Sequence, residues 1–462
     1  MTVRHFTRRA ALSAIAATAA ALGTLHLAPT PAHAATNIQR VVSPGGIEAW
    51  FVQDATVPLV AIQFAFTGGS AQDPAGKPGV ANFAASMLDE GAGDLDSSAY
   101  HERLERRAIQ LNFNVSRDYV RGSLKMLKEN SDEAFDLLRR ALTSARFDDE
   151  PMVRIRSQLL SIVRRSSTNP NSIAHREFWA NAYPGHPYAR ETTGTLESLP
   201  TIEAADLKAY VRHAFARDNV KIAVVGDIDA EHVGKLLDIA FGGLPAKAQL
   251  APVPDAKFVT TPKQVFLPLD VPQTAIMFGG PGIKRADPDF MAAYIVNHVL
   301  GGGSLSGRLY HEVREKRGLA YSVSESLSWM QHADQFIGAT ATRTDKADEA
   351  VATIAGELRR MSEQGPTQEE LDGAKSYLKG AQMLSLDSST KIAGALVQYQ
   401  LDNLGIDYIQ RRPAIIDAVT LDDAKRVAKR IWGQGLLSVS VGRAVQATAQ
   451  TAPVAPAAKA QN

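Results

Sequence analysis

A helix is expected over residues 80–90, and three of its positions that could hold metal ligands carry residues that do not bind zinc. Asn82, Ala85 and Ser86 follow one another at spacings of three and one residues. Zinc is bound by deprotonated histidine, cysteine or carboxylate side chains, and asparagine, alanine and serine supply none of these. This part of the sequence therefore predicts a helix without zinc ligands.

Acidic side chains beside this helix are the remaining candidates for metal donors. Asp89 lies on the same face of the expected helix as Asn82 and Ser86, and Glu90 and His101 follow. No pair of histidines four residues apart accompanies them, and zinc chemistry needs several convergent donors. We therefore expect these acids to be surface or capping groups, and we expect this chain to bind no metal.

Residues 300–323 form a second segment that could take part in catalysis, because they contain the hydrogen-bond donors Arg314 and Tyr321. A guanidinium and a phenolic hydroxyl can stabilise negative charge on a carbonyl oxygen. Gly318 predicts a helix that ends in the left-handed conformation, with Arg314 in its last turn and Tyr321 early in the next strand. Each residue alone has a plainer interpretation: Tyr321 alternates with apolar neighbours like a core aromatic, and Arg314 is typical of helix C-termini.

Residues 78–88 resemble the H-x-x-E-H segment of the pitrilysin or insulinase (M16) zinc peptidases, in which two histidines bind zinc and the glutamate activates water. By this resemblance Asn82 and Ser86 occupy the histidine positions, and Ala85 occupies the glutamate position. The family's third ligand is a glutamate on a later helix, and the matching position here is Ile162. The resemblance implies a chain without the zinc site.

Residues 300–323 match the C-terminal domain of the same family almost without interruption. By this resemblance, Arg314 and Tyr321 match an Arg/Tyr pair that reaches substrate at the zinc site of another domain. Gly301, Gly302 and Gly303 could suggest a phosphate cradle, but no P-loop lysine accompanies them. The resemblance implies instead a flexible, substrate-contacting loop at the mouth of a peptide chamber.

Some bacterial members of the family work as heterodimers in which one subunit holds zinc and the other lacks it, and this chain resembles the second kind. We predict a non-catalytic subunit that is inactive alone. It would complete the peptide chamber of an H-x-x-E-H homologue and donate Arg314 and Tyr321 to peptide at the partner's zinc. The alternative is a non-enzymatic periplasmic chaperone or assembly scaffold with the same fold. A self-sufficient peptidase with rebuilt ligands is disfavoured because the donors are missing.

Two halves of the sequence repeat one pattern and predict an α+β fold. Asp73 and Pro74 are echoed by Asp287 and Pro288, and further echoes follow in order along the chain. A period above about 200 residues indicates domain duplication. Strands clustered in each half favour a mainly antiparallel sheet with helices packed on one face, and the family resemblance implies two such domains arranged as a clamshell. The predicted segments are a domain at 37–243, a linker at 244–262, a domain at 263–443 and a disordered tail at 444–462.

Composition limits the remaining possibilities. The 462 residues include 50 lysines and arginines against 49 acids, which gives no charge excess that would draw the chain to nucleic acid or anionic membranes. The absence of cysteine excludes thiol catalysis and disulfides. Residues 1–34 have the basic start, apolar run and small-residue cleavage site of a signal peptide, of either the twin-arginine or the Sec type. No later segment is apolar enough to span a membrane, so we expect a soluble periplasmic protein.

Overall fold

The computed structural model describes residues 37–259 and 262–444. The predicted signal peptide at 1–34 and nearly all of the predicted tail at 444–462 lie outside the described residues. Across the described ranges, no helix has both the length and the apolar character that a membrane crossing requires.

The first half of the chain builds a six-stranded sheet in the order β1-β2-β6-β3-β5-β4. All neighbouring strands in this sheet are antiparallel except β2 and β6, which are parallel. The strands are β1 (Gln39–Val42), β2 (Glu48–Gln53), β3 (Leu59–Thr67), β4 (Gln110–Val115), β5 (Tyr119–Leu127) and β6 (Val220–Gly226).

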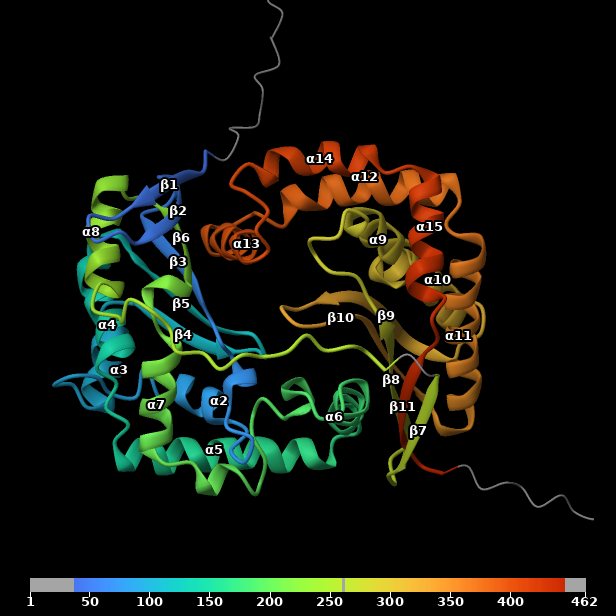
Figure 1. Ribbon diagram of the computed structural model, residues 1–462, viewed down its shortest axis with the longest axis horizontal. Helices are drawn as coiled ribbons and strands as arrows, with labels where there is room; N and C mark the ends of the chain where they lie inside the picture. Colours follow the sequence, from blue (N-terminus) through green and yellow to red (C-terminus); the bar gives the residue numbers. More distant parts are fainter. Residues whose placement is uncertain (1–36, 260–261, 445–462) are drawn as a thin grey trace, which may run out of the picture. The chain divides into compact units, whose positions relative to one another are not determined.

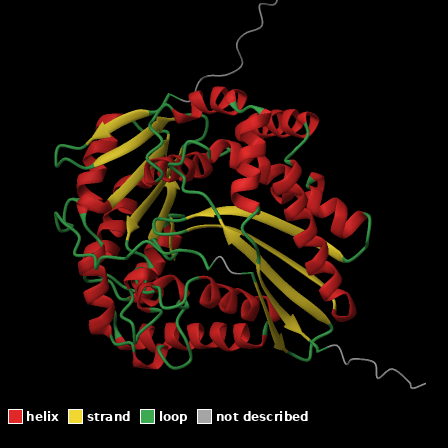
Figure 2. Ribbon diagram, turned by 45° about the vertical axis from the view of Figure 1, so that its right-hand side comes forward, coloured by secondary structure: helices red, strands yellow, loops and turns green. Residues whose placement is uncertain are grey.

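The second half builds a five-stranded sheet in the order β7-β11-β8-β10-β9. Its strands are β7 (Lys263–Pro268), β8 (Gln273–Pro281), β9 (Ala320–Trp329), β10 (Asp334–Arg343) and β11 (Leu437–Gly442). Here too one neighbouring pair is parallel, β7 with β11, and the others are antiparallel. Strand for strand, this order matches β2-β6-β3-β5-β4 of the first sheet, so the two halves share one topology and the predicted duplicated α+β fold is confirmed (Figure 2).

Helices cover one face of each sheet with a hydrophobic core. In the first half these helices are α2 (Val80–Ala85), α3 (Ser97–Arg106), α4 (Ser131–Thr143), α5 (Asp149–Thr168), α7 (Ala204–Ala214) and α8 (Ala230–Phe241). In the second half they are α9 (Phe290–Asn297), α10 (Arg308–Tyr310), α11 (Ala347–Gln364), α12 (Gln368–Leu384), α14 (Tyr408–Ala418) and α15 (Leu421–Trp432). Burial of these apolar faces is the main force that holds helices to sheet.

The opposite face of each sheet is covered by a helix from the other half, which the sequence pattern did not predict (Figure 1). Helix α6 (Pro170–Ala182) packs on β8 and β11, where Phe178 shares a core with Val439. Helix α13 (Ser389–Leu401) packs on β3 and β6, where Leu396 shares a core with Ala65. This reciprocal exchange ties the two halves together through apolar contacts.

Three helices expected from the sequence are shorter or wider than predicted. The helix expected over 80–90 ends at Ala85, because the amides of Met87, Leu88 and Glu90 bond to carbonyls three residues back and tighten the chain into turns. The apolar periodicity of residues 287–300 and 305–317 predicts two further α-helices, and the structure instead has the π-helical turns η6 (His298–Gly302) and η8 (His311–Glu315) in these ranges. Such wide turns are found frequently at functional sites.

Candidate functional site

Helix α2 and its C-terminal cap, Ser86, hold three of the four positions where the family's zinc chemistry would be, and none can bind zinc. Asn82 borders a cavity between the two halves, and Ala85 is buried with 4% of its surface exposed. The hydroxyl of Ser86 donates a hydrogen bond of 2.9 Å to the carbonyl of Asn82. The fourth position, Ile162, lies on α5 and is 45% exposed. Amide, methyl, hydroxyl and sec-butyl groups do not form a zinc site.

The described residues around α2 supply no alternative set of metal ligands. Among the described residues there is no group of three or more histidine, aspartate or glutamate side chains arranged to hold a metal ion. The residues present therefore do not fit zinc.

The acids next to α2 have structural roles. Since the helix ends at Ala85, Asp89 does not extend its face as predicted. Glu90 is buried rather than exposed, accepts a hydrogen bond from Ser97 and forms a 2.6 Å ion pair with Arg154 of α5. The ring of His101 bonds to the carbonyl of Ser97 over 2.8 Å. These groups fasten α3 and α5 beside α2.

Asp73 fixes the start of α2. Its carboxyl accepts hydrogen bonds from the amides of Gly79, over 2.7 Å, and Ala81, over 2.8 Å. Burial raises the pKa of Asp73 to about 7, although these hydrogen bonds act in the opposite direction. The helix frame of the family is thus preserved by a buried cap while its ligands are absent.

Arg314 and Tyr321 are brought together by the structure. The guanidinium of Arg314 lies 4.5 Å from the ring centre of Tyr321 and 5.0 Å from that of Tyr310. It also donates a hydrogen bond to the hydroxyl of Tyr310. Gly318 has φ of 59°, so the predicted left-handed helix end is confirmed, and it lets the chain turn directly from Arg314 into β9. Arg314 is therefore held between two aromatic rings.

Tyr321 points to solvent, with 81% of its surface exposed. The interpretation as a core aromatic, based on alternation, is therefore wrong. The pairing of β9 with β10 shows why: Ala320 is opposite Thr342, but Val323 is opposite Thr340. Three steps on β9 thus match two on β10, which is a β-bulge, and bulges re-aim side chains beside functional sites.

The first half has no such bulge at the matching place. Its strand β4 keeps regular register with β5, with Phe113 opposite Gly122 and Val115 opposite Val120. Phe113 accordingly packs against the core of its half. The outward position of Tyr321 is therefore a property of the second half alone.

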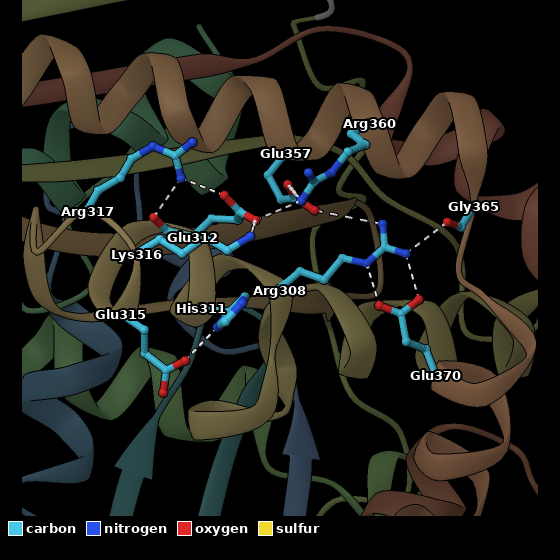
Figure 3. A network of polar contacts seen from close by, with 10 residues as sticks. All are labelled: Arg308, His311, Glu312, Glu315, Lys316, Arg317, Glu357, Arg360, Gly365 and Glu370. Atoms are coloured by element: carbon cyan, nitrogen blue, oxygen red, sulfur yellow. Dashed lines mark hydrogen bonds and ion pairs between the residues drawn. The ribbon is translucent and has the colours of Figure 1, made fainter.

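A network of ion pairs anchors the segment that carries Arg314 (Figure 3). Arg308 forms two hydrogen bonds with Glu370 of α12, at 2.7 and 2.6 Å. Glu312 pairs with Lys316, Arg317 and Arg360, the last on α11. These cations hold the pKa of Glu312 at about 2. The network fixes the turn that precedes β9.

Sequence reasoning missed this network. The partners Glu357, Arg360, Gly365 and Glu370 lie more than 40 positions away from Arg308 and Glu312 along the chain. The local part of the network, the pair of Glu312 with Lys316 four residues later, follows ordinary helical spacing and does not indicate the distant partners. Contacts at this sequence separation are decided by the packing of α11 and α12.

The three glycines are part of a packed turn. Gly301 is buried, and a Cβ atom added to it would lie 2.8 Å from the Cβ of Glu325 and 3.0 Å from its amide nitrogen. The absence of a side chain therefore lets η6 approach β9 closely. Gly302 and Gly303 follow at the end of this turn, and both are less buried than Gly301.

The structure does not bring the Arg/Tyr pair to the vacant zinc positions of this chain. The cavity that Asn82 borders has a volume of about 1180 Å³ and draws its lining from both halves. Among the described residues that line it, none is Arg314, Tyr321 or one of Gly301 to Gly303. The two halves of the predicted catalytic apparatus are therefore separate within one chain.

Comparisons with known proteins match two family models to consecutive parts of the chain. Residues 50–196 match the family described as insulinase (peptidase family M16), and residues 201–378 match the family described as peptidase M16 inactive domain. A relative in Helicobacter pylori, named non-peptidase homolog YmxG, is 27% identical over 78% of this chain and 83% of its own length. The beta subunit of the mitochondrial-processing peptidase of Neurospora crassa is 23% identical over 79% of each chain.

Solved structures share the architecture. The crystal structure of a peptidase M16 inactive domain from Pseudomonas fluorescens superposes with a TM-score of 0.83 at 29% identity, over 88% of this chain and 98% of that one. A Helicobacter pylori protease superposes with a TM-score of 0.80 at 20% identity, over 88% and 99% of the two chains, which shows the same fold. With both domain types matched in order and the ligand positions of α2 empty of donors, the chain belongs to the M16 insulinase peptidase family as a homologue without the family's zinc ligands.

Proposed function

We propose that this protein is the non-catalytic subunit of a periplasmic, heterodimeric M16 metallopeptidase. Its partner would be an M16 homologue that carries H-x-x-E-H and the zinc ion. This chain would complete a joint peptide chamber and present Arg314 and Tyr321 to the peptide bound at the partner's zinc. The proposed domains are the two repeats at 37–243 and 263–443, joined by residues 244–262.

The outward-facing pair of Arg314 and Tyr321 carries this proposal. Within the described residues, the hydroxyl of Tyr321 has no hydrogen-bond partner, and Arg314 has no ion-pair partner and bonds only to Tyr310. An exposed phenol and an unneutralised guanidinium, held together by a bulge and a salt-bridge network, have no evident task in stabilising their own half. Their chemistry suits the oxyanion of a peptide under attack.

The site on α2 supports a role in an assembly. Hydrolysis of a peptide by zinc needs several metal ligands and an activated water, and this chain's own positions supply no donors. One relative is named as a subunit, the beta subunit of a mitochondrial-processing peptidase. A heterodimer of one subunit with zinc and one without would explain why this chain has Arg314 and Tyr321 but lacks the zinc ligands.

This proposal can be tested by purifying each subunit alone and the two together. Each preparation is then analysed for metal and for digestion of an unstructured peptide. We expect zinc and activity in the pair, and neither in this chain alone. Arg314→Ala or Tyr321→Phe should lower the turnover of the assembled pair by about 100-fold, the scale of losing an oxyanion donor. Arg343→Ala is a matched control, because Arg343 is an exposed arginine of the same sheet that pairs only with Asp345.

The outcomes separate enzyme from scaffold. Metal-dependent peptide hydrolysis by this chain alone would contradict the proposal. Loss of co-purification in the Arg314 or Tyr321 variants, with full turnover in whatever pair remains, would make the segment architectural. The alternative function, a non-enzymatic periplasmic chaperone or scaffold, predicts unchanged partner activity in all variants.

A further inference from the structure

The cavity between the two halves carries more positive charge than its own acids neutralise. It has a volume of about 1180 Å³, enough for several residues of an extended peptide, and is lined by residues from both sheets and from α13. Its cationic lining residues are Arg117, Arg121, Lys284 and Arg285, and its acidic ones are Asp118 and Asp402. The question is which of these charges are already paired.

Arg117 is stacked but not ion-paired. It lies in the turn between β4 and β5, with its guanidinium 3.7 Å from the ring centre of Trp179. Its Nε donates 2.8 Å to the carbonyl of Tyr188, and its two Nη groups have no acceptor among the described residues. Burial lowers the pKa of Arg117 to about 10, with nearby acids such as Glu191 opposing that shift through space, so it stays charged at neutral pH.

Arg121, like Arg117, donates its hydrogen bond to a neutral acceptor. It lies on β5, and its Nη2 donates 2.6 Å to the side-chain oxygen of Gln398 on α13. That acceptor is a neutral amide, and Arg121 forms no ion pair with any described residue. Burial also lowers the pKa of Arg121, which indicates that its charge is incompletely compensated.

The two acids of the cavity accept hydrogen bonds from other residues, and they act on Arg117 and Arg121 only through space. Asp118 is buried and accepts from the hydroxyl of Tyr188 and, over 3.0 Å, from the amide of Gln331. Asp402 accepts from Gln398, over 2.9 Å, and from Trp329, over 3.2 Å. Both carboxylates serve to fasten neighbouring segments of the chain.

The remaining cations of the cavity have acids of their own. Lys284 forms a 3.0 Å ion pair with Asp255, and Arg285 lies 3.7 Å from the carboxylate of Asp402. Arg117 and Arg121 are therefore the two cations of this cavity whose in-plane donors are open and whose bonded partners are neutral. Planar guanidinium donors match the geometry of a carboxylate.

We propose that Arg121 binds a carboxylate of a peptide inside the cavity of this chain, and that Arg117 adds positive charge to the same lining. The carboxylate would come from an acidic side chain or from the peptide's C-terminus. The identification of the carrier as a peptide rests on the proposed function, whereas the carboxylate site rests on this chain alone. This chain would then select which peptides occupy the joint chamber.

The test measures binding to this chain without any partner. Fluorescently labelled peptides of ten residues would differ only in charge: one with a central glutamate and an amidated C-terminus, one with glutamine and a free C-terminus, and one with glutamine and an amidated C-terminus. We expect at least one carboxylate-bearing peptide to bind about tenfold or more tightly than the neutral one. Which peptide gains affinity identifies the source of the carboxylate.

Variants locate the effect. Arg121→Gln should abolish the preference for the carboxylate, and Arg121→Lys should retain part of it because the charge remains without the planar fork. Lys284→Gln removes one positive charge from the same cavity but from a residue that already has an acid, so it should leave the preference within about twofold. Unfolding midpoints equal to that of the wild type would show that the variants fold.

Equal binding of all three peptides, or no measurable binding of any, overturns the proposal. So does a preference that survives Arg121→Gln or falls equally in Lys284→Gln, because general cavity charge would then explain it. Failure of the heterodimer to form would contradict the proposed function and leave these binding outcomes unaffected.

Discussion

Glu325 is a buried acid on β9, beneath the glycine turn, and replacing it with glutamine should change how stability depends on pH. Only 1% of its surface is exposed. Its carboxyl accepts hydrogen bonds from Asn297 and, over 3.3 Å, from Trp432, and no described cation pairs with it. Burial therefore raises the pKa of Glu325 from 4.5 to about 8.

The sign and size of the effect follow from this shift. Because the folded pKa is raised, the protonated carboxyl favours the folded state, and this contribution is complete below 4.5 and lost as the pH rises through about 8. At 1.36 kcal/mol per unit, the whole loss is on the order of 5 kcal/mol, of which about 2.5 kcal/mol falls between pH 6 and pH 9. Glu325→Gln cannot ionise, so it should not lose this part.

The assay is urea unfolding of the wild type and of Glu325→Gln at pH 6, 7, 8 and 9. At pH 6 we expect the variant to be about 1 kcal/mol more stable, because the cost of about 1 kcal/mol for one donor without its acceptor is outweighed by the roughly 2 kcal/mol that the wild type has already lost between pH 4.5 and pH 6. Towards pH 9 the difference should shift by about 2.5 kcal/mol in favour of the variant. Asp73, with a pKa of about 7, and Asp334, with a pKa of about 6, titrate in both proteins and cancel in the difference.

A difference between the two proteins that stays constant from pH 6 to pH 9 would refute the reasoning, since it would show that Glu325 does not change its protonation there. The exposed Glu105 supplies a control. Glu105→Gln should follow the wild type at every pH.

Two further variants test the elements that hold the Arg/Tyr segment. Gly301→Ala should cost about 1–3 kcal/mol in unfolding free energy because its methyl group would overlap β9. Gly356→Ala, in open space on α11, should be neutral or stabilising, and equal costs for both would contradict the packing argument. Glu312→Gln should lower the free energy of unfolding by about 2 kcal/mol at neutral pH. This cost should shrink as the pH falls from 4.5 to about 2, because only the ionised carboxylate of Glu312 stabilises the fold. Urea unfolding at pH 7 and pH 3 measures this change, and a cost that does not shrink at pH 3 would contradict it.

Local patterns predicted most elements correctly because their signals are contained in short windows. The apolar pattern of residues 368–384 predicts a helix with the bounds of α12, and the patterns of residues 59–66 and 335–340 predict strands that lie within β3 and β10. Left-handed Gly318 was predicted from its place between helix and strand and is confirmed. The helix over 80–90 was predicted too long, because alternative hydrogen bonds after Ala85 depend on how the next turn packs.

Cross-strand and cross-domain features could not be predicted in this way. Alternation places Tyr321 in the core, and only the register of β9 against β10 reveals the bulge that turns it outward. The exchange of α6 and α13 between the halves likewise depends on which sheet face each helix meets. These outcomes are set by partners far along the chain.

The sequence by itself determined the duplicated α+β fold and the absence of zinc ligands at Asn82, Ala85, Ser86 and Ile162, because element type and donor chemistry belong to the residues themselves. Only the tertiary structure decided which reactive side chains are exposed and which charges lack an ion-pair partner. It turned Tyr321 to solvent beside Arg314, and it left Arg117 and Arg121 facing a cavity whose acids are bonded elsewhere. Exposure and charge compensation are properties of neighbours in space, and the packing of distant segments supplies those neighbours.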